Sequence, residues 1–247
     1  MRAPATARVG GYRRPSRGTV VLLVVAVVVA VVVTLVTVHL LRRDATHCAH
    51  WDVVFNGYGS ASCTEDVLSL RPAVATASDE THAGLATSRT VAVTEGEVTT
   101  VRATVTTRDQ LREGQEPNPW EVAWILWSYE ANDHFYALVL KPNGWEVSKQ
   151  DPAHPGSQRF LASGTSPTYA VGTTHEVLLS IDTTQPDAMT VTVVVNGAEL
   201  ATVSDTDAPY RSGKVAAYTE DAAIDVLVEP VREAAPDSTV SPNREDA

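Results

Sequence analysis

The feature that most constrains this chain is an apolar run from Thr19 to Leu41 that contains no Asp, Glu, Lys or Arg. As an α-helix, its 23 residues would span roughly 34 Å, enough to cross a hydrocarbon core of about 30 Å. Its many valines favour strands in water, but a segment exposed to lipid must satisfy its own backbone hydrogen bonds and is therefore helical. No convincing small-residue cleavage site follows it, which argues against a removed signal peptide. We therefore expect an uncleaved transmembrane signal-anchor helix over residues 19–41, with the lipid bilayer as its partner.

The charges beside this run predict its orientation. Five arginines precede it and two directly follow it: Arg2, Arg8, Arg13, Arg14 and Arg17 against Arg42 and Arg43. Because positive charge is retained on the cytoplasmic side, residues 1–18 should be a basic cytoplasmic segment. Residues 42–50 would be a juxtamembrane linker, and all that follows would be extracytoplasmic. The sequence thus predicts a single-pass protein of the cell membrane.

The charge of the remaining chain excludes one class of partner. All 30 acidic residues lie at or beyond Asp44, and residues 44–247 carry 30 acidic and 12 basic side chains, a net charge of -18. A surface of that sign repels the phosphates of nucleic acid, so DNA and RNA are excluded as partners. Residues 232–247 contain few apolar side chains that could dock, and we expect them to form a disordered tail.

The only two cysteines, Cys48 and Cys63, also suit an extracytoplasmic domain. A disulfide between them would close a loop of about 15 residues, which is worth about 3 kcal/mol in an oxidising compartment. The alternative is a metal site made of His47, Cys48 and His50. Three ligands within four residues match none of the usual zinc spacings, so the pattern favours the disulfide.

Residues 51–231 have the pattern of an all-β domain. Short segments rich in Val, Thr and Ile, such as 98–106 and 190–195, are separated by turn residues, and no helical period occurs. The number of such segments exceeds that of an immunoglobulin domain and predicts a larger antiparallel two-sheet β-sandwich or jelly roll. Two Asn-Gly pairs, at 143–144 and 196–197, predict two-residue hairpin turns.

Seven of the fifteen aromatic residues lie between Trp120 and Trp145. A two-residue turn at 143–144 would pair Lys141 with Glu146, and strand alternation would then place Lys141, Glu146 and Ser148 on one face. Alternation along the preceding strand places Trp124 on one face, and Trp127 and Tyr129 on the other.

A polar face that carries aromatic rings is what a carbohydrate ligand needs, because sugar rings offer CH groups to aromatics and hydroxyls to polar groups. The alternative is that these rings only fill the core. The candidate ligand-binding residues are Trp124, Trp127, Tyr129, Tyr136, Glu146, Lys149, Gln158 and Arg159.

Several segments resemble one superfamily. They are WDVVFNGYGS (51–60), NPWEVAWILWSYE (118–130), HFYALVLKPNGWEVSKQDP (134–152), QRFLASG (158–164) and GKVAAYTEDAAIDVLVEPV (213–231). They are similar to the concanavalin-A-like lectin/glucanase superfamily, especially its LamG-like and 3-keto-disaccharide-hydrolase-type jelly rolls of bacterial surface proteins. The resemblance covers most of residues 51–231. It implies a concave glycan-facing sheet and a structural calcium ion bound by Asp225 and by backbone oxygens around Asn56 and Gly57.

The sequence favours binding over catalysis. It contains neither the Glu-x-Asp-x-x-Glu motif of laminarinase-like relatives nor a Gly-x-Ser-x-Gly nucleophile motif. The leading hypothesis is a non-catalytic domain that binds a carbohydrate or a cell-envelope polysaccharide. One alternative is a glycoside-acting hydrolase of the 3-keto-disaccharide type that uses Glu146, Lys149 and Arg159. The other is a structural protein-interaction domain whose aromatic residues all belong to the core.

Overall fold

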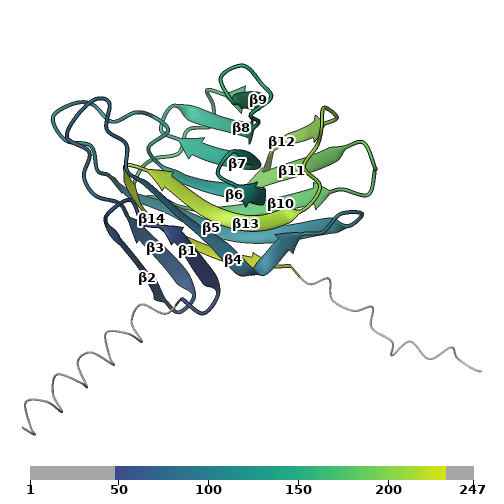
Figure 1. Ribbon diagram of the computed structural model, residues 1–247, viewed down its shortest axis with the longest axis horizontal. Helices are drawn as coiled ribbons and strands as arrows, with labels where there is room; N and C mark the ends of the chain where they lie inside the picture. The colour runs from purple at the N-terminus through teal and green to yellow at the C-terminus, as the bar shows by residue number, and fades with distance from the viewer. Residues whose placement is uncertain (1–47, 232–247) are drawn as a thin grey trace, which may run out of the picture. The chain divides into compact units, whose positions relative to one another are not determined.

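The computed structural model describes residues 48–231, which form fourteen strands in two seven-stranded antiparallel sheets. Figure 1 shows the two sheets as separate layers. The predicted all-β sandwich is thereby confirmed. Within residues 48–231 no helix is long and apolar enough to cross a membrane. The predicted cytoplasmic segment (1–18), transmembrane helix (19–41) and tail (232–247) lie outside the described residues, as does most of the linker.

Each sheet combines strands that are distant in sequence. The first sheet has the spatial order β1 (Trp51–Phe55), β4 (Ala83–Val93), β13 (Gly213–Glu220), β6 (Ala123–Ala131), β7 (His134–Lys141), β8 (Gly144–Gln150) and β9 (Gln158–Gly164). The second has the order β12 (Ala198–Asp205), β11 (Met189–Val195), β10 (Thr174–Asp182), β5 (Val98–Gln110), β14 (Ala222–Pro230), β3 (Val67–Arg71) and β2 (Ser60–Thr64).

Strand alternation explains the core between the sheets. In β11, Val191 and Val193 are buried, whereas Thr190 and Thr192, which alternate with them, are only partly buried. The inward-facing residues of both sheets join one large apolar cluster, to which Leu138 and the other inner residues of the first sheet contribute. The β-branched segments therefore form strands because one face of each is covered by the opposite sheet.

The two Asn-Gly pairs behave differently. Asn196 and Gly197 have φ angles of 52° and 81° and join β11 to β12 as predicted, because Val195 pairs directly with Ala198. The other turn is one residue earlier than predicted: Lys141 pairs with Gly144, so the loop is Pro142-Asn143.

The register of the β7–β8 hairpin is consequently shifted by two residues, and Val139, not Lys141, lies opposite Glu146. A shift of two preserves the alternation of faces. Lys141, Glu146 and Ser148 therefore still share one face, and the Lys141 ammonium forms an ion pair with the Glu146 carboxylate.

The predicted disulfide is confirmed. Cys48 and Cys63 are bonded, with their Cα atoms 5.2 Å apart. Cys48 lies three residues before the start of β1 in the first sheet, and Cys63 lies on β2 at the edge of the second sheet. The bond therefore links the two sheets at the start of the described chain.

A buried ionic cluster links the sheets where β9 and β12 approach each other. Asp205 on β12 is fully buried, and its carboxylate lies 3.0 Å from the ammonium of Lys149, which is also fully buried. Tyr136 donates a hydrogen bond to Asp205 at 2.6 Å, and Arg159 donates another at 2.5 Å. Burial alone would raise the pKa of Asp205, but the hydrogen bonds from Tyr136 and Lys149 hold this pKa below its ordinary value.

We predict that Asp205→Asn lowers the free energy of unfolding by about 3–5 kcal/mol, because it removes the closest counter-ion of the buried Lys149 ammonium and leaves only the Asp151 carboxylate, 3.7 Å away. Chemical denaturation of the full chain, followed by tryptophan fluorescence, measures this loss. Asp207→Asn is the matched control: Asp207 also pairs with Arg159, but its side chain is 84% exposed, and we expect a loss below about 1 kcal/mol.

The pH dependence has a defined sign. Since the folded pKa of Asp205 is lowered, its contribution is complete above its unfolded value, near 3.8, and is lost as the pH falls through the folded pKa. The difference between the wild type and Asp205→Asn should thus be constant at neutral pH and narrow below about pH 3.8. If Asp205→Asn and Asp207→Asn lower the free energy of unfolding equally, this role for Asp205 is contradicted. It is also contradicted if the stability difference between the wild type and Asp205→Asn does not narrow in acid.

Candidate functional site

An irregularity in β6 determines which face of the first sheet its aromatic residues point to. Ser128 has a φ angle of 50°, and the pairing with β7 is shifted after Trp127. Trp127 therefore points toward the opposite sheet, whereas Tyr129 points outward together with Trp124. Simple alternation placed Trp127 and Tyr129 on the same face, and that part of the prediction is wrong because of this irregularity.

Four of the eight predicted ligand-binding residues lie on the inner face. Trp127 and Tyr136 are fully buried, with their rings stacked at 5.5 Å. Lys149 and Arg159 belong to the buried cluster around Asp205. These four residues hold the two sheets together and cannot contact a ligand on the outer face.

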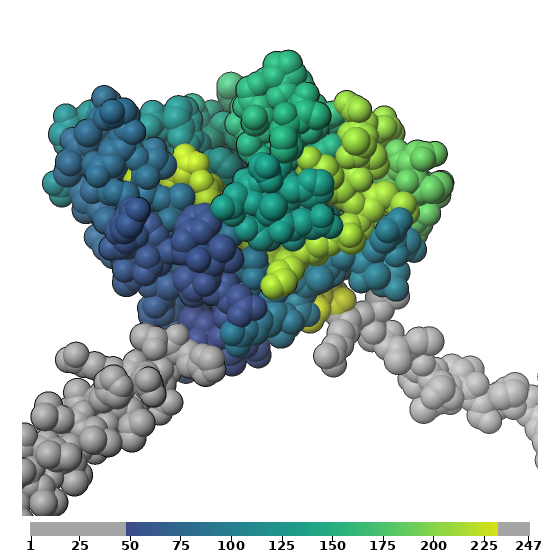
Figure 2. All heavy atoms as spheres, viewed as in Figure 1, coloured from purple at the N-terminus to yellow at the C-terminus, as the bar shows by residue number. Residues whose placement is uncertain are grey.

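The other four, Trp124, Tyr129, Glu146 and Gln158, are brought together on the outer face of the first sheet. They line two adjoining cavities of about 340 and 240 Å³, both of which include Trp124, Gln158 and Glu220. We call this surface the aromatic groove. Its lining residues are Phe55, Leu85, Trp120, Trp124, Tyr129, Asn132, Phe135, Glu146, Gln150, Gln158, Phe160, Tyr218 and Glu220. Figure 2 shows the yellow-green end of β13, where Glu220 lies, recessed between neighbouring loops.

The groove combines apolar rings with hydrogen-bonding groups. The rings of Trp124 and Tyr218 meet edge to face at 5.1 Å and form its floor. At its rim, Trp120 is 44% exposed and Phe160 is 62% exposed, which is unusual for such large apolar side chains. The side-chain amides of Asn132, Gln150 and Gln158 add donors and acceptors. Exposed rings beside amide groups form a surface that suits a ligand with both apolar and hydroxyl faces.

Glu220 is an acidic group of the groove with a perturbed pKa. Its carboxylate accepts a hydrogen bond from the Tyr218 hydroxyl at 2.6 Å. Burial raises the pKa of Glu220, and the nearby carboxylates of Asp221 and Glu121 raise it further. A partly buried acid with a perturbed pKa in a cleft is typical of functional sites.

A second buried ionic network lies next to Glu220, at the end of β13. Arg112 donates to the carboxylates of Glu121 and Asp221, both at 2.7 Å, and all three side chains are at most 3% exposed. Asp221 forms the turn after β13 with a φ angle of 43°, and its carboxylate accepts a hydrogen bond from the His82 backbone N–H at 2.7 Å. These contacts hold the end of β13 in place.

Sequence reasoning missed several groove residues, above all Tyr218 and Glu220. They lie about ninety positions after Trp124 in the chain, yet β13 pairs with β6 and places Tyr218 directly opposite Trp124. In β13, Tyr218 and Glu220 are partly buried, whereas Thr219 between them is buried. Strand alternation could therefore have indicated that Tyr218 and Glu220 share the outer face. The partner strand was not readable, because long-range pairing leaves no local pattern.

The predicted catalytic residues do not share a face. Glu146 lies on the outer face with Lys141, whereas Lys149 and Arg159 lie on the inner face with Asp205. The first sheet separates the two groups, so these three residues cannot act on one substrate.

The predicted calcium ligands are not assembled into a site either. Asp225 lies on β14 in the second sheet, where it accepts hydrogen bonds from Ser69 at 2.8 Å and Arg108 at 2.6 Å. Asn56 and Gly57 follow β1, a strand of the first sheet. Within residues 48–231, no three His, Cys, Asp or Glu side chains are grouped as a metal ion would require. This donor set does not fit calcium, because the carboxylate already binds an arginine.

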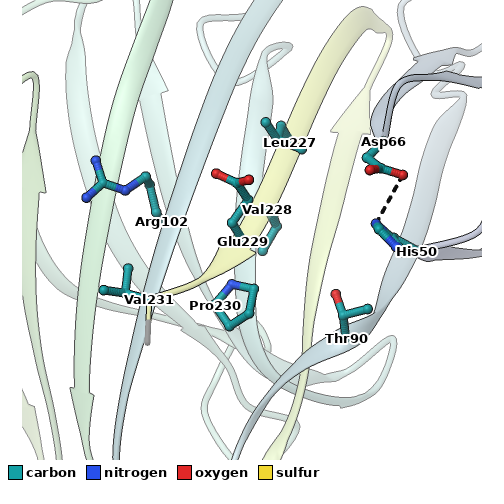
Figure 3. Close-up of a pocket in the computed structure, with 9 residues that line it drawn as sticks. All are labelled: His50, Asp66, Thr90, Arg102, Leu227, Val228, Glu229, Pro230 and Val231. Carbon is teal, nitrogen blue, oxygen red and sulfur yellow. Dashed lines mark ion pairs between the residues drawn. The ribbon is translucent and has the colours of Figure 1, made fainter. Parts of the chain in front are cut away.

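A further cavity, of about 480 Å³, lies near both ends of the described chain (Figure 3). His50 and Asp66 form an ion pair at 3.1 Å on one side of it, and Arg102 and Glu229 lie on the other. Its lining contains no Trp, Tyr or Phe. The aromatic groove is therefore the better candidate for a ligand site.

Comparison with known proteins supports the fold. No protein-family model and no curated protein matches the sequence. The structure is similar to the carbohydrate binding module CBM66 from Bacillus subtilis, with a TM-score of 0.50 and 12% sequence identity over 73% of this chain and 95% of that one. It is also similar to the metal-free carbohydrate recognition domain of Emp46p, with a TM-score of 0.51 and 9% identity over 74% and 87% of the two chains. The chain thus shares the β-sandwich fold of these two domains, and at these identities the likeness extends to the fold alone.

Proposed function

We propose that this protein binds a carbohydrate in the aromatic groove without chemically changing it. The observation that carries the proposal is the pair of exposed rings, Trp120 and Phe160, at the rim of a cleft with polar amides. Aromatic faces stack on the CH groups of sugar rings, while amides and carboxylates bond to the hydroxyls. Two structures with a similar fold are described as a carbohydrate binding module and a carbohydrate recognition domain, which supports the same class of ligand.

We predict that Trp120→Ala and Phe160→Ala each weaken binding about tenfold, which corresponds to a loss of about 1.4 kcal/mol of stacking energy. Both side chains are exposed, so both variants should fold like the wild type. An oligosaccharide array probed with the full chain identifies a ligand, and titration calorimetry measures its Kd for each variant. Tyr58→Ala is the control, because Tyr58 is a 91% exposed aromatic outside the groove. Unchanged affinity in both groove variants would contradict the proposed site.

Glycoside hydrolysis is a second candidate because Glu146 and Glu220 line the same smaller cavity. Such hydrolysis uses two carboxylates, one as proton donor and one as base or nucleophile. Lys141 forms an ion pair with the Glu146 carboxylate, whereas the raised pKa of Glu220 suits a proton donor.

A binding role predicts that array-positive oligosaccharides are recovered uncleaved after prolonged incubation with the full chain. Chromatography of the incubated oligosaccharides, with detection of newly formed reducing ends, measures any cleavage. Cleavage that Glu146→Gln and Glu220→Gln both abolish, and that Glu176→Gln on the second sheet does not, would replace binding with hydrolysis as the function.

We further propose that residues 19–41 anchor the protein in the cell membrane and that the domain is extracytoplasmic, where cell-envelope polysaccharide would be available to it. The apolar run and the flanking arginines support this placement. The Cys48–Cys63 disulfide agrees with an oxidising compartment.

Lysine labelling tests this orientation. Of the three lysines in the chain, Lys149 is fully buried and Lys141 is 17% exposed, whereas Lys214 is 52% exposed. A membrane-impermeant amine reagent applied to intact cells should therefore label the domain mainly at Lys214, and Lys214→Arg should remove most of the label. Labelling that requires cell lysis, or recovery of the chain in the soluble fraction, would contradict the placement.

A further inference from the structure

The carboxylate of Glu220 lies in the aromatic groove without a basic partner among residues 48–231. Tyr218 donates a hydrogen bond to its Oε1 at 2.6 Å, and no Lys, Arg or His of the described chain forms an ion pair with it. Glu220 is only partly buried and lines both cavities of the groove. It is therefore available to a ligand.

The nearest cations are already used by other carboxylates. Arg112 binds Glu121 and Asp221, and two further N–H groups donate to backbone carbonyls at 2.9 and 3.1 Å. Lys141 binds Glu146. Three carboxylates at the end of β13, those of Glu121, Glu220 and Asp221, thus share one arginine, and the local charge is negative.

The lining of the groove has the composition of a cation site. None of its residues is Lys, Arg or His, while Trp120 and Trp124 line the smaller cavity together with Glu220. An ammonium group is attracted to the face of an aromatic ring, with Trp the most favourable, and forms strong charge-assisted hydrogen bonds with a carboxylate. A carboxylate or phosphate on the ligand would find no basic side chain in this lining and would lie near the Glu146 and Glu220 carboxylates.

The charge of the whole domain acts in the same direction. Residues 48–231 contain 25 Asp and Glu and 10 Lys and Arg, a net charge of -15. A potential of this sign concentrates cationic ligands near the surface and repels uronic acids, sialic acids and phosphorylated sugars.

We propose that the aromatic groove selects saccharides with a free, protonated amino group, and that the ammonium of a de-N-acetylated hexosamine unit pairs with Glu220. This inference rests on the proposed function and names its ligand class. Neutral parts of the saccharide would stack on Trp120 and Phe160, while the ammonium would occupy the acidic end of the groove. The raised pKa of Glu220 reflects burial beside other carboxylates, and a bound ammonium would lower this pKa.

The test compares two matched ligands, the β-1,4-linked trisaccharide of glucosamine and its fully N-acetylated counterpart. Titration calorimetry with the full chain is performed at a pH at which the amines are protonated and at physiological ionic strength, which screens long-range attraction. We expect the glucosamine trisaccharide to bind at least tenfold more tightly. Glu220→Gln should remove this preference.

Glu176→Gln is the control for non-specific charge, because it removes one exposed carboxylate on β10 in the second sheet and should leave the preference intact. Equal or tighter binding of the N-acetylated trisaccharide, or a preference that survives Glu220→Gln, overturns the inference. If the N-acetylated ligand binds and Trp120→Ala weakens it without any preference for the amine, the inference fails but the proposed function stands. If neither these trisaccharides nor any array glycan binds, both fail.

Discussion

The function proposed here depends on one constraint: successive side chains of a strand point to opposite faces, and the central strands of the first sheet are apolar on both. The inner face packs against the second sheet through residues such as Leu138 and Val147. The outer face carries a second apolar cluster that includes Trp124 and Tyr129, and no sheet of the described chain covers it. Next to this cluster the rings of Trp120 and Phe160 remain exposed, and an exposed aromatic patch is typical of a binding surface.

Charged residues usually lie exposed on the surface, and two sites in this domain differ from that pattern. Lys149 and Asp205 lie in the interior, where each would be costly without the other, so together they fix how the edges of the two sheets meet. Glu220 lies in the groove without a cation of the described chain. The Lys149–Asp205 pair stabilises the fold and is not accessible to a ligand. The Glu220 carboxylate, in contrast, would gain a positive partner only when a cationic ligand binds.

Local patterns predicted much of the fold. The β-sandwich, the Cys48–Cys63 disulfide and the turn at 196–197 each follow from composition, spacing or turn chemistry that a short segment contains. The candidate site was only half predicted. The irregularity at Ser128 reversed the expected face of Tyr129, and the inward direction of Lys149 became clear only with its partner Asp205. Such features depend on which distant strands pair or pack together, and the sequence of one strand does not identify its partner strand.

The most direct test of the central claim uses the five tryptophans of the chain, all of which lie within residues 48–231. Trp120 and Trp124 line the groove, whereas Trp51 and Trp127 are buried in the core. In a titration of the ¹⁵N-labelled full chain with an array-positive glycan, NMR should show shifts of the indole N–H signals of Trp120 and Trp124, with those of Trp51 and Trp127 unchanged. A bound glycan that leaves the signals of both groove tryptophans in place would contradict the assignment of the ligand to this face.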